Sequence, residues 1–220
     1  MGETKTQLSL SRIAAENFGV AILISATSFA TKAALASDHT AVSPIWPAAG
    51  IALASALVLG WRVAPGIIAP LVVGSVMAGN PWLFSALAPL GVALGIYLGR
   101  WLLNLRAFDM AMPSTRDVLL LAGFGAILPA GIAGFGTAWS LMQAGQIPGQ
   151  LLGSVGLIYW VANAAGTMVV APVLLLLAAG RFAPRKLRAG SVLAGSFQLA
   201  IVIAACWFAF FGKAGTGNQA

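Results

Sequence analysis

Side chains able to act as acids, bases or metal ligands are scarce in this sequence. The only histidine, His39, stands beside Asp38, and the only cysteine is Cys206. The five acids flank the long uncharged stretches of the chain and none lies inside one: Glu3, Glu16, Asp38, Asp109 and Asp117. A hydrolytic site needs a base beside a nucleophile or a pair of carboxylates, and a metal site needs several ligands close together. We therefore predict no catalytic residues, no metal site and no cofactor.

Binding is the chemistry that the remaining polar and aromatic residues suit. Tyr159, Trp160 and Asn163 lie close together in an otherwise apolar stretch. A spacing of three residues places Trp160 and Asn163 on one helical face, an aromatic plate beside an amide. Such a face could line an apolar cavity with one polar anchor, suited to a small apolar or weakly polar ligand. We add Asn80 and Trp46 as candidate ligand-binding residues. The alternative is that Asn163 only hydrogen-bonds a neighbouring helix.

The composition places these residues in a membrane. Of 220 residues, 60% are hydrophobic and 8% are charged, and the mean hydropathy is +0.93. Soluble domains have about 25% charged residues, so this chain is expected to lie in a lipid bilayer. The net charge of +7 does not require a nucleic-acid partner, because basic residues of membrane proteins collect in cytoplasmic loops. We expect no nucleic acid among its partners.

Uncharged runs predict an all-α, polytopic bundle of about seven spans, since one crossing needs about 20 apolar residues. The first span runs from Asn17 to Ser37, without a convincing cleavage site, and is expected to be retained. Single spans are expected between Asp38 and Arg62 and between Arg188 and Lys213. Paired spans are expected in Val63–Gly99, divided at Gly79–Pro81, and in Val118–Gly180, divided at Gln143–Gln150.

The distribution of basic residues predicts the orientation. If the N-terminus is cytoplasmic, all basic residues except Lys32 and Lys213 fall on the cytoplasmic side. Lys32 is then expected to reach the interface with its long side chain. The resulting division is a cytoplasmic segment 1–16, a transmembrane domain 17–212 and a short tail 213–220 on the outside. A bacterial inner, or plasma, membrane is the expected location.

Local patterns predict three further features. Trp46 and Trp61 are expected at the headgroups at the two ends of the second span, because indole rings favour that boundary. Gly91, Gly95 and Gly99 form a stripe of small residues, which is expected to pack against another helix of the same chain. Ser114 or Thr115 is expected to cap the fifth helix, with Asp117 in its first turn, and the basic run Arg181–Arg188 is expected to meet anionic headgroups.

Three sequence motifs resemble a known family. IWPAAGIALASALVLGWRVAPGI, residues 45–67, contains a Trp-Pro-x-x-Gly-Ile entrance and a Gly-x-Arg-x-x-Pro-Gly turn. LRAFDMAMPSTRDVLLL and YWVANAAGTMVVAPVLLL follow later in the same order. Together they resemble the bacterial membrane-associated sensor family of the first type, MASE. The residues that carry the resemblance are Trp46, Pro47, Gly50, Ile51, Gly60, Arg62, Pro65, Gly66, Trp160, Gly166, Ala171 and Pro172.

The resemblance implies a non-catalytic integral membrane sensory domain of bacterial signal transduction. The sequence departs from the family pattern in two places. Ala162 and Asn163 replace a Gly-Asp pair, and the fourth span lacks an acidic residue. Family members usually continue into a kinase or cyclase transmitter, so we expect a sensory module without its transmitter, either free-standing or a shortened copy. Its expected partners are the bilayer and a membrane or signalling protein. The alternatives are a substrate-binding membrane subunit of a transporter and a purely structural membrane protein.

Overall fold

The structure, a computed structural model, describes residues 2–35 and 45–180 of the chain. Several sequence expectations therefore lie outside the described residues. These are the last span between Arg188 and Lys213, the tail 213–220, the basic run Arg181–Arg188, Asp38, His39 and Cys206.

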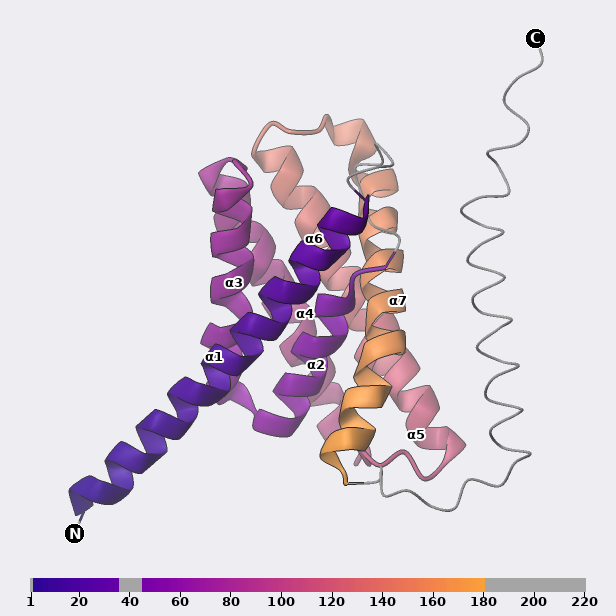
Figure 1. Cartoon of the computed structure of the whole chain (residues 1–220). Helices are drawn as coiled ribbons and strands as arrows, with labels where there is room; N and C mark the ends of the chain where they lie inside the picture. The colour runs from indigo at the N-terminus through magenta and orange to yellow at the C-terminus, as the bar shows by residue number, and fades with distance from the viewer. Residues whose placement is uncertain (1, 36–44, 181–220) are drawn as a thin grey trace. The chain divides into compact units, whose positions relative to one another are not determined.

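The described chain is helical and contains no strand, as the sequence predicts (Figure 1). Short connections join the helices, and they include the predicted breaks at Gly79–Pro81 and Gln143–Gln150. A π-helical segment, η2, joins α5 to α6, and single 3-10 turns, η1 and η3, precede α3 and α7. The elements are α1 (Gly2–Leu35), α2 (Pro47–Leu59), η1 (Trp61–Val63), α3 (Ala64–Met77), α4 (Trp82–Leu105), α5 (Thr115–Leu120), η2 (Leu121–Ile127), α6 (Leu128–Gln143), η3 (Gly149–Leu151) and α7 (Leu152–Ala178).

Four helical stretches among the described residues are long and apolar enough to cross a bilayer: Leu10–Ala33, Trp82–Leu105, Thr115–Gln143 and Gly149–Ala178. Two apolar helical stretches are shorter, Pro47–Leu59 and Trp61–Met77. The 13 residues of α2 extend only about 20 Å, against a hydrocarbon core of about 30 Å. The helical membrane bundle is therefore confirmed, while the count of seven spans stays a prediction.

Helix α2 packs against α7 with backbone almost touching backbone. The Trp46 N–H donates to the carbonyl oxygen of Ala162 over 2.9 Å. A Cβ on Gly166 would lie 2.0 Å from the carbonyl oxygen of Trp46, and one on Gly50 would lie 2.7 Å from the carbonyl oxygen of Gly166. Both positions exclude any side chain, because real contacts are far longer. The Trp-Pro-x-x-Gly motif and Gly166 thus form the two halves of one helix seam.

This seam places the beginning of α2 inside the bundle. Ala162 lies ten residues after Leu152, where α7 begins, which is about 15 Å along that helix. The Trp46 N–H is thus bonded beside the middle of α7, while the expected position of Trp46 at the headgroup boundary stays a prediction. Pro47 is the first residue of α2, where the absence of an N–H group costs no intrahelical hydrogen bond.

The turn between α2 and α3 is fastened to α1. Gly60 has a φ of 86°, a conformation that L side chains rarely adopt. The Asn17 side chain accepts the Gly66 N–H over 2.7 Å and donates to the carbonyl oxygen of Arg62 over 2.9 Å. Glu16 pairs with Arg62, with Nε and Oε2 2.8 Å apart. The Gly-x-Arg-x-x-Pro-Gly motif is therefore a turn held by two adjacent α1 side chains.

The glycine stripe of α4 packs within the chain, which confirms the expectation. A Cβ on Gly95 would lie 2.4 Å from the carbonyl oxygen of Pro129, and one on Gly99 would lie 2.6 Å from Pro129 Cγ. The predicted cap is also confirmed, because the Ser114 side chain accepts the Asp117 N–H over 3.4 Å.

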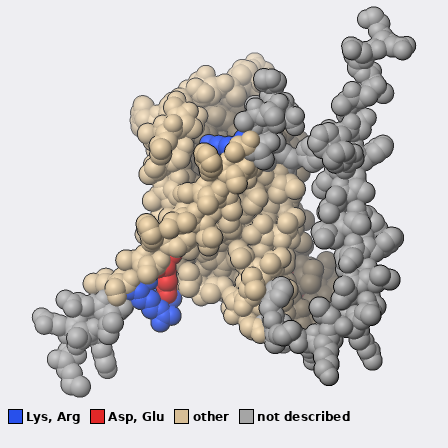
Figure 2. Space-filling model, in the orientation of Figure 1, with Lys and Arg blue, Asp and Glu red and all other residues tan. Residues whose placement is uncertain are grey.

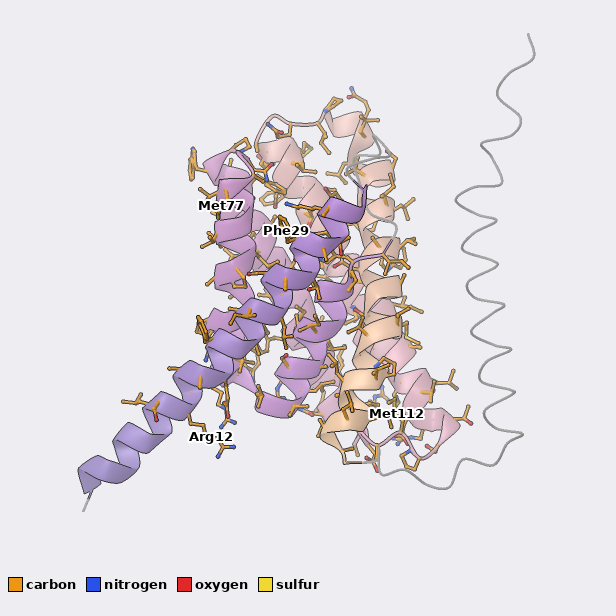
Figure 3. All side chains as sticks on the ribbon, viewed as in Figure 1. Arg12, Phe29, Met77 and Met112 are labelled. Atoms are coloured by element: carbon orange, nitrogen blue, oxygen red, sulfur yellow. The ribbon has the colours of Figure 1, made fainter. Side chains whose placement is uncertain are left out.

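The described arginines gather at one end of the bundle. Arg100 donates to the carbonyl oxygens of Ala56 and Leu57, the latter over 3.0 Å, and so joins the end of α4 to the end of α2. Arg116 donates to the carbonyl oxygen of Arg106 over 2.6 Å. Figure 3 shows Arg12 and Met112 at this end, and Phe29 and Met77 toward the other. On the face drawn in Figure 2, charged side chains are few and most of the surface is uncharged.

The α2–α7 seam gives a direct stability prediction. Gly166→Ala should destabilise the fold by about 1–3 kcal/mol, because the added Cβ must push the Trp46 carbonyl away. Gly153→Ala is the matched control on the same helix, since a Cβ there meets nothing within 4 Å. Thermal unfolding in detergent should show a lower midpoint for the first variant and an equal or higher midpoint for the second, because alanine favours helices. Equal midpoints for the two variants would contradict the close contact.

Candidate functional site

A cavity of about 530 Å³ lies among α1, α3, α4, α6 and α7, next to Trp46, the residue immediately before α2. This volume falls in the range of about 300–1,000 Å³ that small-molecule sites occupy. Most of its wall is apolar, with Leu71 from α3, Phe84 and Val92 from α4, and Leu141 from α6. Pro70 and Pro89 also line it, each inside a helix. The wall chemistry suits an apolar molecule of modest size.

Helix α7 contributes two of the predicted residues, Tyr159 and Asn163, one turn apart. Asn163 is buried, and its amide nitrogen donates to the carbonyl oxygen of Tyr159 over 2.7 Å. This hydrogen bond stays within α7, so it is not the bridge to another helix that the sequence left open as the alternative. Thr137 on α6 likewise donates to the carbonyl oxygen of Ala133, over 2.8 Å.

A second, much smaller void of about 20 Å³ lies on the other side of Asn163. Its lining includes Asn163 and Thr167 from α7, and Val92 from α4, which also borders the large cavity. A void of this size has room for about one water molecule, provided that polar groups reach it. Asn163 therefore borders both spaces and is the one buried side-chain amide among the described residues.

Asn80, in the turn between α3 and α4, also lines the cavity. Its amide nitrogen lies 3.2 Å from both the carbonyl oxygen and the hydroxyl of Ser75. The Ser75 hydroxyl in turn lies 2.9 Å from that of Ser85, which is buried on α4. These bonds hold α3 and α4 together where the cavity reaches their connecting turn.

Helix α1 supplies the charged part of the wall. Ser28, Thr31 and Lys32 all line the cavity and share one face of α1, because they are spaced by three and four residues. Thr31 donates its hydroxyl to the carbonyl oxygen of Thr27 over 2.7 Å. The Ser28 hydroxyl oxygen is buried and has no hydrogen-bond partner among the described residues. Sequence reasoning had assigned Lys32 only to the interface.

The structure brings together four of the five predicted residues, Trp46, Asn80, Tyr159 and Asn163, around this cavity. Trp160 lies elsewhere. Its indole N–H donates to the carbonyl oxygen of Ile127, at the end of η2, over 2.7 Å. Positions three apart on a helix differ by about 60° around its axis, since a turn takes 3.6 residues. That difference is enough to turn Trp160 toward η2 and α6 while Asn163 borders the cavity.

Several motif residues have structural positions away from the cavity lining. Gly50 and Gly166 form the α2–α7 seam, and Arg62 and Gly66 belong to the turn fastened to α1. Pro172 lies inside α7, and the residue before it, Ala171, is fully buried.

The sequence did not single out Glu16 and Asn17, which hold that turn. Their position at the edge of the first apolar run was the one signal that could have found them.

Among the described residues, no three histidine, cysteine, aspartate or glutamate side chains come close enough to hold a metal ion. The arrangement can bind a molecule by shape and a few polar groups.

Comparison with known proteins agrees with the geometry of the motifs. The MASE1 family matches residues 16–217, nearly the whole chain, including the Trp-Pro entrance, the α2–α3 turn and the α7 seam. No curated protein and no solved structure matches the chain. A family match of this extent identifies the chain as an integral membrane sensory domain, and the chain therefore belongs to the MASE1 family of membrane-associated sensor domains.

Proposed function

We propose that this membrane sensory domain detects a small, mainly apolar molecule that binds in the cavity of about 530 Å³, without catalysis of its own. One observation carries the proposal: Trp46, Asn80, Tyr159 and Asn163, far apart in sequence, line the same cavity. A wall with few polar groups and much apolar surface matches the usual composition of small-molecule sites. The family is sensory, which does not favour the transporter subunit considered from the sequence.

Ligand binding can produce a signal only if the ligand prefers one helix arrangement over another. Helix α7 is suited to this role, because Tyr159 and Asn163 line the cavity while Trp160 bonds the η2 segment. A small rotation of α7 around a bound molecule would alter both contacts together. We propose that a signalling protein partner responds to this rearrangement.

We further propose that the chain crosses the bacterial inner membrane seven times, with the N-terminus in the cytoplasm and the C-terminus outside. The end of the bundle that carries Arg62, Arg100 and Arg116 would then face the cytoplasm, as the positive-inside tendency favours. The turn between α6 and α7 would face the outside.

Cysteine labelling tests whether the cavity accepts a ligand. In a Cys206→Ser background, Thr137→Cys places a thiol at the cavity wall and Ser154→Cys places one at an exposed position at the start of α7. N-ethylmaleimide should label both thiols in the purified full chain. Decanol should slow labelling at position 137 in a saturable manner and leave position 154 unchanged, because only the first lies in the cavity. Failure to label position 137, or equal slowing at both positions, would contradict the proposal.

The orientation is tested in the same background with a membrane-impermeant maleimide on intact cells. Gln146→Cys lies in the turn between α6 and α7, and Met110→Cys lies in the connection between α4 and α5. Position 146 should be labelled directly, and position 110 only after the membrane is permeabilised. The reverse pattern would contradict the orientation, and direct labelling of both would contradict the placement of the two connections on opposite sides.

A further inference from the structure

The α1 side of the cavity carries two polar groups for which no partner is found among the described residues. The Ser28 hydroxyl is buried without a hydrogen-bond partner in the described part of the chain. Lys32, one turn further along α1, lines the same cavity and is exposed, so it stands at the cavity rim. A buried hydroxyl without a partner is unfavourable, and a ligand atom at this position would supply the missing hydrogen bond.

The charge of the wall favours an anion. Lys32 is the only ionisable basic residue among the described residues that line the cavity, and no aspartate or glutamate lines it with them. A cation at the rim of an apolar chamber attracts a group of opposite charge, and water screens the pair less on the side that faces the chamber. One lysine is a single point charge, unlike the arginine clusters that bind doubly charged phosphate groups. The wall therefore matches a group with one negative charge.

Much of the remaining cavity wall is apolar, with Leu71, Phe84, Val92 and Leu141. Its polar side chains include Thr137 and Asn163, which donate to carbonyl oxygens of their own helices. From the joint position of the charge, the unpartnered hydroxyl and this apolar chamber, we infer that the sensed molecule is a single-chain carboxylate amphiphile. Lys32 binds its carboxylate, Ser28 donates a hydrogen bond to it, and the apolar body fills the chamber. This inference rests on the proposed function and narrows its ligand class.

The test compares two probes that differ only in the head group, decanoate and decanol. Equilibrium binding of each isotope-labelled probe is measured with the full chain in phosphatidylcholine nanodiscs, after subtraction of uptake by protein-free nanodiscs. The wild-type chain should bind decanoate more tightly than decanol. Lys32→Gln should weaken decanoate binding by about tenfold or more, the scale of a charge-assisted hydrogen bond, and leave decanol binding unchanged.

Two further variants serve as controls. Lys5→Gln removes the same charge from the same helix, 27 positions earlier and about 40 Å away along the axis, and should not change decanoate binding. Lys32→Arg keeps the charge and should retain most of the affinity. The thermal unfolding midpoint of each variant in detergent checks that the fold is intact, and Ser28→Ala should weaken decanoate binding less than Lys32→Gln does.

The possible outcomes separate this inference from the proposed function. Saturable binding of both probes with equal affinity, unaffected by Lys32→Gln, would overturn the inference that the ligand carries a carboxylate. It would still support the cavity as a binding site. Absence of saturable binding by either probe would overturn both. Repeating the titration in nanodiscs that contain phosphatidylglycerol should give the same decanoate affinity. Loss of binding there would overturn the inference in favour of a lipid headgroup at Lys32.

Discussion

The close contact between α2 and α7 governs the rest of the structure. In a bilayer, lipid tails surround helices as favourably as apolar side chains do, so helices associate through close packing and hydrogen bonds. Gly50 and Gly166 allow the two backbones to meet, and the Trp46 N–H completes the contact with Ala162. This seam sets the depth at which α2 begins, and therefore which residues surround the cavity.

Most polar side chains around the cavity are satisfied by the backbone of their own helix. Thr31, Thr137 and Asn163 each donate to a carbonyl oxygen four residues earlier. Such bonds need no partner on another helix. The spacing between helices is then set by their apolar and small residues. The cavity wall thus includes polar side chains that bond within their own helices, whereas the Ser28 hydroxyl has no hydrogen-bond partner among the described residues.

The sequence predicts the helices well because lipid imposes long uncharged runs, and Gly79–Pro81 and Ser114 mark boundaries by local backbone chemistry. It also predicts four residues of the cavity wall. Two features could not be predicted from the sequence. The depth of Trp46 depends on a contact with a helix more than a hundred residues away, and local composition carries no record of that pairing. The direction of Trp160 depends on which neighbour covers each side of α7, which spacing alone does not specify.

The short length of α2 has a consequence for the interior volume. Its 13 residues make α2 about 10 Å shorter than a helix that crosses the hydrocarbon core. A column about 10 Å across and about 10 Å tall encloses roughly 800 Å³, the same order as the cavity of about 530 Å³ beside Trp46. A truncated helix, packed tightly at its remaining length, is a simple way for a bundle to keep an internal space without loosening its other seams.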